Sequence, residues 1–531
     1  MPQRYFNTAG PIKKDLHYHI APLQRWDMQH IMELMEQQKY FVVHAPRQTG
    51  KTTALLALQD ELNQGGVYEA LYANVEPAQA ARNDYQAGVK TIVDIISENH
   101  ASRFGNDLLT DYKRKISLEN DGWGNALAKI LRFWAAHSSK RVVLILDEVD
   151  ALIGDTLISV LRQIRSGYPE RPNHFPQNII LCGVRDIRDY RLDTAVPEQQ
   201  TITGGSAFNI KAESLLLGNF SVEEIEQLLV QHTEITGQSF ESGAAKVIFL
   251  YTDGQPWLVN ALCYEATFGP EGVRNRTEMV RLERLHRAKE LLILRKDTHL
   301  DQLTDKLRED RVKRVVQPIL SGQTELADVH TDDIQYTIDL GLVRKSAEGN
   351  LIISNPIYQE IIPRTLVGDT EMVLTISRQW YISEQGTLDM AKLLTGFQAF
   401  FRQHSEHWLE RFDYKEAGPQ LLLQAFLQRI VNGGGTIIRE YGLGRRRTDL
   451  FILFPYAAAT QKVVIELKIL RNSLDNTIEE GMAQTADYMD KCAADEGHLI
   501  IFDRRNTLSW EEKLFFLQKS HGNKQIQIWG C

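Results

Sequence analysis

The sequence predicts an α/β protein of several domains, and three observations support this prediction. The chain has 531 residues, which is more than one hydrophobic core organises and predicts about three or four domains. Residues 40–44, 141–147 and 178–183 are short, almost wholly apolar runs, as expected of parallel strands buried on both faces. After residue 415 the expected order is helix, three strands, helix, strand. We therefore expect an α/β region near each end of the chain.

The first apolar run leads directly into a loop with the pattern of a P-loop, after which a helix begins. In such a loop the backbone N–H groups and the helix N-terminus surround phosphates. Lys51 is expected to reach the β- and γ-phosphates, and Thr52 to hold Mg²⁺. Ala45 replaces the first glycine of the motif, which is tolerated only if its φ is negative. The residues predicted to bind nucleotide here are Ala45, Pro46, Arg47, Gln48, Thr49, Gly50, Lys51, Thr52 and Thr53.

The second apolar run ends in adjacent carboxylates, Asp147 and Glu148. Doubly wound folds bind ligands at the C-terminal edge of their strands, so both carboxylates are expected at the nucleotide. Asp147 is predicted to hold Mg²⁺, and Glu148 to polarise the water that attacks the γ-phosphate. The third run leads to Arg185, which either senses the γ-phosphate or forms a structural ion pair. We expect ATP or GTP as the ligand, with ATP preferred.

A helix is expected to begin after Ser221, because Ser221 and Glu224 form a capping box. Further along, Gly254-Gln-Pro256 resembles the Gly-x-Pro motif of STAND-type ATPases, in which the proline closes over the nucleotide base. With the P-loop and the Asp-Glu pair, this motif makes residues 1 to about 270 resemble the archaeal-type ATPase branch of the AAA+/STAND group. The resemblance implies a homo-oligomeric switch that binds and hydrolyses ATP and changes shape with the nucleotide.

The region from residue 311 to 366 has the pattern of a winged helix, with two strand-like segments around the turn at Gly349. A helix that reads the major groove is usually basic or rich in amides. The helix beginning at Thr331 instead carries Asp332, Asp333 and Asp339 and has no lysine or arginine. We therefore favour a structural or autoinhibitory role over DNA reading.

Residues 449–468 are the most informative stretch of the chain. They predict two strands, the first beginning at Asp449 and the second carrying Glu466 and Lys468 two residues apart. Side chains alternate along a strand, so Glu466 and Lys468 face the same way and converge with Asp449 if the strands are neighbours. Hard oxygen ligands suit Mg²⁺ or Mn²⁺, and a lysine can orient the water or stabilise charge. Taken alone, Glu-x-Lys is also typical of ordinary solvated charges.

With the element order after residue 415, this trio resembles the PD-(D/E)XK nuclease superfamily. The resemblance implies that Asp449 and Glu466 bind the metal and that Lys468 is catalytic. Gln484 and Tyr488 match a Gln-x-x-x-Tyr motif, and are expected to position the lysine or the nucleic-acid backbone. Two candidates stay open for the helix carboxylate: Glu416, the better match, and Glu440 on the first strand.

Charge is distributed unevenly along the chain. Acidic residues (69) outnumber basic ones (60), so the whole chain is not drawn to nucleic acid. Between residues 429 and 471, however, there are eight basic residues and only three acidic ones. Arg445, Arg446 and Arg447 are expected to clamp phosphates, or else form a solvated turn. The four cysteines lack metal-site spacing, and no signal peptide or membrane span is evident, so we expect a cytoplasmic protein without membrane contacts.

The predicted layout is an ATPase core (residues 1–215), a helical lid (216–308), a winged-helix-like module (309–368), a helical linker (369–412) and a PD-(D/E)XK domain (413–531). Our hypothesis is an ATP-regulated, Mg²⁺-dependent nuclease that cuts nucleic acid, with DNA favoured and defence against foreign DNA as a fitting role. Its activating signal cannot be read from the sequence. The alternative is a nucleotide-dependent switch whose C-terminal domain binds nucleic acid or a partner without cutting.

Overall fold

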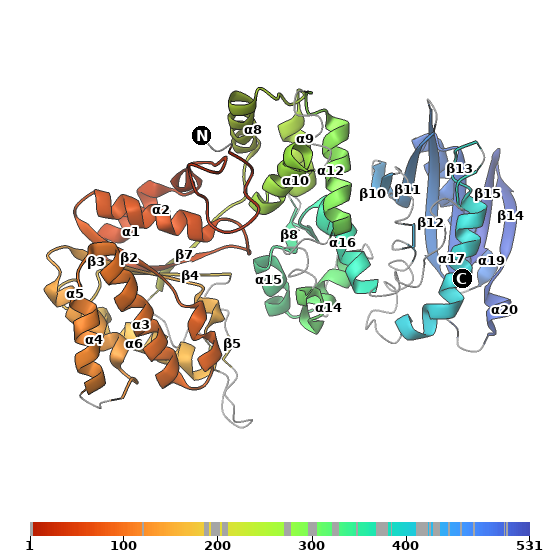
Figure 1. The fold of residues 1–531 in the computed structure, drawn as a ribbon. Coiled ribbons are helices and arrows are strands. Elements are labelled where there is room, and N and C mark those ends of the chain that lie inside the picture. The colour runs from red at the N-terminus through yellow and green to blue at the C-terminus, as the bar shows by residue number, and fades with distance from the viewer. Residues whose placement is uncertain are drawn as a thin grey trace. The chain divides into compact units, whose positions relative to one another are not determined.

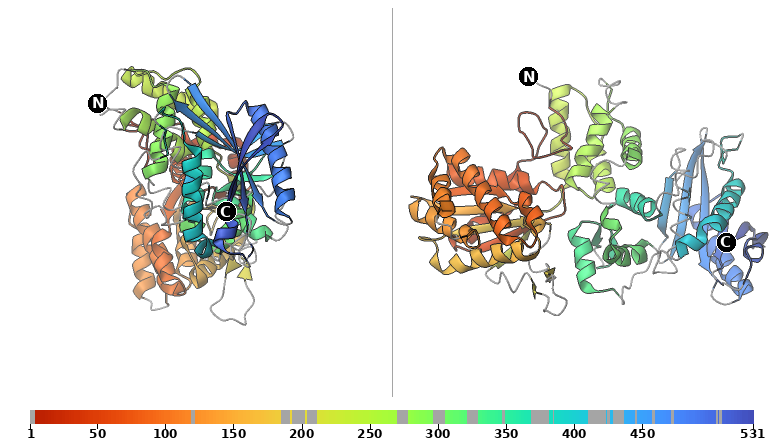
Figure 2. Two further views of the ribbon diagram at one scale, coloured as in Figure 1. Left: turned by 90° about the vertical axis from the view of Figure 1, so that its right-hand side faces the viewer. Right: turned by 60° about the horizontal axis from the view of Figure 1, so that its bottom comes forward.

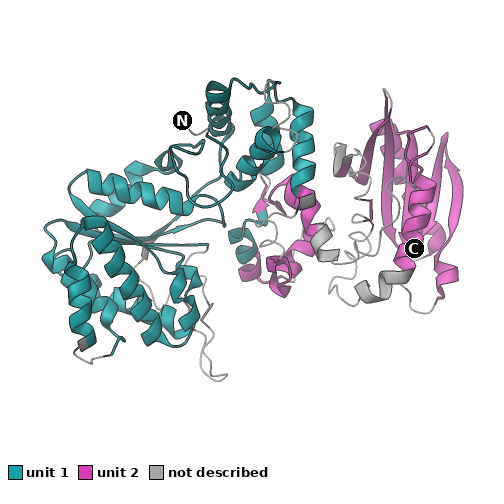
Figure 3. Cartoon of the chain, in the orientation of Figure 1, with its two compact units in different colours: residues 1–292, 335–343 teal, residues 293–334, 344–531 magenta. Residues whose placement is uncertain are grey.

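The computed structural model describes residues 4–118, 122–184, 191–192, 202–203, 211–269, 278–295, 305–320, 329–346, 349–367, 381–383, 385–409, 423, 426–427, 436–443, 446–456, 459–470, 473–503, 505 and 508–531. The chain divides into two compact units, residues 1–292 with 335–343 and residues 293–334 with 344–531 (Figure 3). Each unit contains one large β-sheet.

The first unit is built on a five-stranded sheet with the order β2-β3-β4-β1-β7, in which every neighbouring pair is parallel (Figure 1). The strands are β1 (Tyr40–His44), β2 (Tyr68–Asn74), β3 (Arg141–Asp147), β4 (Asn178–Gly183) and β7 (Lys211–Leu216). The three apolar runs are therefore parallel strands, as predicted. Because β4 lies between β1 and β3, the loop after β1 and the carboxylates after β3 flank the end of β4.

Helices cover both faces of this sheet (Figure 1). Alternate strand residues pack against α1 (Met28–Glu36) and α2 (Lys51–Gln64) on one face. The other residues pack against α3 (Tyr85–Phe104), α4 (Leu108–Leu118), α5 (Ala126–His137) and α6 (Gly154–Gly167). Shorter elements of the unit are η1 (Pro22–Arg25), η2 (Glu76–Ala81), η3 (Val149–Ala151), η4 (Tyr168–Glu170), β5 (Arg191–Leu192) and β6 (Ile202–Thr203).

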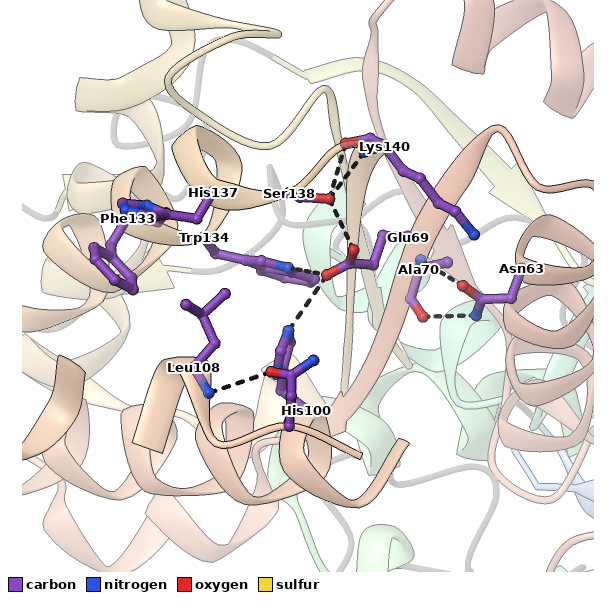
Figure 4. A network of polar contacts seen from close by, with 11 residues as sticks. Asn63, Glu69, Ala70, His100, Leu108, Phe133, Trp134, His137, Ser138 and Lys140 are labelled. Carbon is purple, nitrogen blue, oxygen red and sulfur yellow. Dashed lines mark hydrogen bonds and ion pairs between the residues drawn. The ribbon is translucent and has the colours of Figure 1, made fainter. Parts of the chain in front are cut away.

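A network of hydrogen bonds connects α3 and the end of α5 to the first half of β2 (Figure 4). Glu69 accepts hydrogen bonds from Trp134 Nε1 and from Ser138 Oγ, and lies 3.3 Å from His100 Nε2. Burial raises the pKa of the Glu69 carboxyl, but the hydrogen bonds from His100, Trp134 and Ser138 outweigh it, and the net pKa is lowered. Because Glu69 lies at the end of β2 away from Asp147, the network stabilises the fold rather than the site.

The lid follows β7 and consists of α8 (Val222–Thr236), α9 (Ala244–Thr252), α10 (Pro256–Phe268) and α12 (Leu282–Arg295). The capping box predicted for the first of these helices is present. Glu224 N donates to Ser221 Oγ at 3.2 Å, and Ser221 N donates to the Glu224 carboxylate at 2.9 Å.

The next elements are α14 (Asp310–Leu320), α15 (Thr331–Asp339), β8 (Val343–Lys345), β9 (Leu351–Ile353) and α16 (Pro356–Val367), with β8 and β9 paired. Asp333 of α15 is only 8% exposed and lies 3.1 Å from Arg311 Nε and 3.2 Å from Arg314 Nη2. Since its charge is paired with two arginines of α14, Asp333 supports the structural role for this helix rather than an autoinhibitory acidic surface.

The second unit contains a six-stranded sheet with the order β10-β11-β12-β13-β15-β14. The strands are β10 (Thr436–Leu443), β11 (Arg446–Tyr456), β12 (Ala459–Ile469), β13 (Glu496–Phe502), β14 (Phe516–His521) and β15 (Lys524–Gly530). The strands from β10 to β12 pair antiparallel, whereas β13 is parallel to both β12 and β15. The three strands, helix and strand predicted here are all present, and the hairpin of β14 and β15 is additional.

Helices pack on both faces of this sheet, as the left view of Figure 2 shows. The helix α19 (Leu474–Cys492) connects β12 to β13 and packs on the face that carries Val464 and Leu499. On the opposite face, α17 (Met390–Leu409) brings the Phe401 ring centroid to 5.4 Å from that of Phe502. A short helix, α20 (Trp510–Lys513), precedes β14. Most of the helix predicted over 416–431 lies outside the described residues. Within the described part of the chain, no helix is long and apolar enough to cross a membrane.

Candidate functional site

The predicted P-loop connects β1 to α2, and a hydrogen bond within the loop stabilises it. Thr49 Oγ1 donates a hydrogen bond to the Pro46 carbonyl at 2.8 Å. Gln48 and Gly50 have φ values of 58° and 89°, whereas Ala45 does not have a positive φ. Because the φ of Ala45 is not positive, its methyl group is tolerated at the position of the first glycine of the motif.

Lys51 is almost completely buried and folds back over the loop. Its Nζ donates to the carbonyls of Ala45 at 2.9 Å and Pro46 at 3.0 Å. Arg47 is exposed, and Thr53 Oγ1 accepts a hydrogen bond from Ile12 N at 3.2 Å. Lys51 thus lies over its own loop, and its role toward the phosphates stays a prediction, while Thr53 connects the loop helix to the N-terminal segment.

Asp147 is fully buried and meets the start of α2. Thr52 Oγ1 donates to Asp147 Oδ2 at 2.8 Å, and the Tyr72 hydroxyl donates to the same oxygen at 2.8 Å. Glu148 N donates to Asp147 Oδ1 at 2.9 Å. The structure therefore brings Thr52 and Asp147 together, as the sequence predicted. A hydroxyl and a carboxylate are hard oxygen donors that fit Mg²⁺ beside phosphates.

Tyr72 was not predicted as a site residue. It lies on β2, where it pairs with Ile145 of β3. Burial raises the pKa of its hydroxyl, and the Asp147 charge raises it further, so Tyr72 acts as a hydrogen-bond donor at neutral pH. The sequence signals β2 as a strand, but its position beside β3 depends on packing across the sheet.

Glu148 follows β3 in a left-handed backbone conformation, with a φ of 58°. This conformation is unfavourable for a residue with a side chain, and such strain is frequent at functional sites. Burial and the neighbouring Asp150 raise the pKa of Glu148, and Lys51 opposes that shift. A carboxyl with a raised pKa is a better proton acceptor, which suits the predicted role in polarising water.

The Gly-x-Pro segment contacts the P-loop through the residue between its two motif positions. Gln255 Nε2 lies 3.5 Å from the Gln48 carbonyl, at the limit for a hydrogen bond. Pro256 is buried at the first position of α10. Its role toward the nucleotide base stays a prediction, and Arg185 lies outside the described residues.

In the second unit, the structure brings Asp449, Glu466 and Lys468 together on β11 and β12. These strands pair antiparallel with Leu450 opposite Ile465, so Asp449 lies opposite Glu466. Asp449 Oδ2 accepts a hydrogen bond from Leu467 N at 2.8 Å, and Lys468 Nζ donates to Glu466 Oε1 at 2.9 Å. The predicted convergence of two carboxylates and one ammonium is therefore observed, and their roles stay predictions.

The electrostatics of Glu466 fit a bound cation. Its side chain is only 4% exposed, and its Oε2 is buried without a hydrogen-bond partner. Burial and the Asp449 charge raise the pKa of Glu466 to about 7, although Lys468 opposes the shift. A buried carboxylate oxygen without a hydrogen-bond partner is costly, and a divalent cation bound at Glu466 would offset that cost.

The donor set of this site is small. Within the described residues, no group of three or more histidines, cysteines and acidic residues is arranged to hold a metal. The site there consists of Asp449 and Glu466. Glu416 lies outside the described residues, and the position of the Glu440 side chain is not described.

Gln484 and Tyr488 lie on α19, which packs on the face of the sheet that carries Glu466. They are four residues apart, so they lie on one side of the helix. Tyr488 is buried, and Gln484 Oε1 is buried without a hydrogen-bond partner. Arg445 lies outside the described residues, while Arg446 and Arg447 belong to β11 with side chains that are not described.

We expect Glu466 to make the metal-free protein sensitive to pH. A carboxyl whose pKa is raised from 4.5 to about 7 stabilises the fold most below about pH 4.5, and this contribution disappears as the pH rises through about 7. The loss is at most about 3 kcal/mol. Native-state hydrogen exchange of the β12 amides in the presence of chelator should show it in the wild type and not in Glu466→Gln. An identical pH dependence in both proteins would contradict it.

The family comparison agrees with the first unit. The family model described as the AAA domain matches residues 34–190, which include the P-loop and Asp147. A Walker-type ATPase of Pyrococcus abyssi is 14% identical, with 67% of this chain and 99% of that chain covered and a TM-score of 0.46. The RuvB Holliday junction branch migration motor of Thermotoga maritima is 13% identical, with coverages of 63% and 91% and a TM-score of 0.33.

Cdc6p from Pyrobaculum aerophilum is 14% identical, with 65% of this chain and 92% of that chain covered and a TM-score of 0.34. No curated protein matches the sequence. On the strength of the domain match, the parallel sheet and the P-loop geometry, residues 34–190 contain a P-loop ATPase core of the AAA type.

Proposed function

We propose that this protein is an ATP-dependent switch whose AAA-type core controls a metal-dependent nuclease in residues 413–531. The observation that carries the second half of this proposal is the pairing of Asp449 with Glu466, with Lys468 donating to Glu466. This arrangement agrees with the PD-(D/E)XK resemblance of the sequence. The ATPase half is supported by the domain match and by the contacts of Lys51, Thr52 and Asp147.

In the ATPase core, each group has a distinct task. Lys51 and the loop N–H groups would bind the phosphates, while Thr52 and Asp147 would hold Mg²⁺. Tyr72 donates to Asp147 and so fixes its carboxylate, which leaves Glu148 as the proton acceptor for the attacking water.

In the second unit, Asp449 and Glu466 would hold the cation, Mg²⁺ or Mn²⁺. When bound, such a cation lowers the pKa of a coordinated water and stabilises negative charge on the phosphate. Lys468 shares its ammonium with Glu466, so it stays close to the site and can orient the water or the phosphate. Gln484 and Tyr488 would position the nucleic-acid backbone or Lys468.

The basic residues between 429 and 471 lie on both sides of the site residues in the sequence and favour a nucleic-acid substrate. We propose DNA as that nucleic acid. A homo-oligomer and a role in defence against foreign DNA complete the proposal.

The alternative function is a switch whose C-terminal region binds nucleic acid or a partner without cutting it. One observation favours it: Lys468 donates to Glu466, and a Glu-x-Lys pair on a strand is also typical of an ordinary ion pair. Incubation of purified protein with supercoiled plasmid and Mg²⁺ or Mn²⁺ separates the two functions. Nicking that EDTA abolishes supports the nuclease, whereas DNA binding without nicking supports the alternative.

The nucleotide is expected to gate cleavage rather than to drive it, because metal-dependent hydrolysis of a phosphodiester needs no ATP. Glu148→Gln prolongs the ATP-bound state and should therefore change the cleavage rate without altering the nuclease residues. A shift of a few kcal/mol between two arrangements would suffice. Plasmid cleavage is measured without nucleotide, with ADP and with ATP, beside a fragment that starts near residue 370. Identical rates in all four reactions would show that the two regions are uncoupled.

A further inference from the structure

Arg25 ends η1 and contacts two parts of the first unit that are far apart in the sequence. Its Nη1 donates a hydrogen bond to the Thr49 carbonyl at 2.7 Å, and its Nη2 donates to the Gly218 carbonyl. The guanidinium carbon lies 4.9 Å from the centroid of the Phe220 ring. One planar cation therefore joins the P-loop to residues 217–220, which connect the sheet to the lid.

The contact with Thr49 acts on a peptide unit of the P-loop. The Thr49 carbonyl and the Gly50 N–H belong to the same planar peptide and point in opposite directions. By binding the carbonyl, Arg25 directs the Gly50 N–H away from itself and polarises it. N–H groups at this position of a P-loop bind phosphate. Gly50 has a φ of +89°, and a Cβ there would lie 3.1 Å from Arg25 Nη1.

Residues 217–220 are attached both to the sheet and to the lid. Leu217 N donates to the His44 carbonyl at the end of β1 at 3.1 Å, and Phe220 N donates to the Gly254 carbonyl of the lid at 2.8 Å. Gly254 fits so closely that a Cβ would lie 2.0 Å from the Phe220 carbonyl oxygen. Arg25 binds this connecting segment at Gly218, between its two attachments.

Arg25 is partly buried, and its guanidinium lies in a desolvated environment. Burial lowers the pKa of its guanidinium to about 10, Glu224 opposes that shift, and the group stays charged at neutral pH. Its Nε is buried without a hydrogen-bond partner. A partly buried cation with a buried, unpaired N–H costs stability, whereas an apolar side chain in its place would not.

We propose that Arg25 is a positioning residue of the ATPase site that couples the P-loop to the lid. The inference rests on ATP binding at the P-loop. Phosphate bound at Gly50 polarises the Thr49 peptide and strengthens its hydrogen bond to Arg25. Through the Gly218 carbonyl and the Phe220 ring, the same guanidinium then restrains the segment that leads into α8.

The test uses the full-length protein with Arg25→Lys, and Arg171→Lys as a matched control. Arg171 also donates to two carbonyls, those of Tyr168 and Gln38, and lies 3.4 Å from the Tyr168 ring centroid. It does so away from the P-loop. A planar guanidinium donates to two carbonyls in a fixed geometry and stacks on a ring at the same time. A lysine ammonium cannot do this. We measure ATP affinity and the hydrogen exchange of residues 217–220 with and without ATP.

In the wild type and in Arg171→Lys, saturating ATP should slow exchange across residues 217–220. In Arg25→Lys, ATP should bind about tenfold more weakly, and saturating ATP should no longer slow that exchange. Wild-type affinity and protection in Arg25→Lys would overturn the coupling role, as would equal losses in both variants. A wild-type protein that binds no ATP would instead overturn the nucleotide site itself, together with this inference.

Discussion

Replacement of Lys51 by alanine is expected to remove measurable ATP binding. The ammonium is held over the P-loop by the carbonyls of Ala45 and Pro46, so it lies at the loop that receives the phosphates. Hydrogen bonds to charged groups contribute more than neutral ones, and the loss should weaken binding by about a hundredfold or more. Calorimetric titration with Mg²⁺-ATP measures this directly.

Glu148→Gln is the matched control for this experiment, because it alters the same site without touching the phosphate contacts. This variant should bind ATP with wild-type affinity and hydrolyse it about a hundredfold more slowly, since only the proton acceptor is lost. Unchanged affinity in Lys51→Ala would show that residues 45–53 are not a nucleotide-binding loop.

Substitution of the trio on β11 and β12 should have an effect of similar size on cleavage. Asp449→Ala, Glu466→Gln and Lys468→Ala are each expected to reduce metal-dependent plasmid cleavage by about a hundredfold or more. For Glu466 the glutamine variant is preferred, because the side chain is only 4% exposed and alanine would also remove packing. Gel electrophoresis of the plasmid over a time course gives the rates.

Lys519→Ala provides the control for lost positive charge in the same sheet. Lys519 lies on the exposed edge strand β14, outside the basic stretch between residues 429 and 471. This variant should therefore cut DNA at the wild-type rate. Wild-type cleavage by Glu466→Gln would exclude this cluster as the catalytic centre.

Local sequence patterns predicted the parts of both sites that lie at the ends of strands. A buried parallel strand is a continuous apolar run, so the residues that follow it, such as Lys51 and Asp147, could be assigned to one edge of the sheet. Asp449 was expected beside Glu466 only if their two strands were neighbours, and the pairing of β11 with β12 meets that condition.

Contacts between distant segments could not be predicted in this way. Tyr72 meets Asp147, and Arg25 meets Gly218, only because the sheet and the lid pack as they do. The pairing of Asp333 with the arginines of α14 depends likewise on how two helices pack. The β14 and β15 hairpin differs, because its turn at Gly522 and the alternation around Ile526 are visible in the sequence.

The strand order of the first sheet also determines when the P-loop strand can be completed during synthesis. β1 is made first, yet its two neighbours in the sheet are β4 and β7, which come more than a hundred residues later. Both pairings close long loops, and such contacts form slowly. On the ribosome, β1 and the loop after it must therefore wait until residue 216 has emerged. Nascent chains released before residue 178 should be recognised by chaperones, because the apolar strand β1 then has neither of its neighbours.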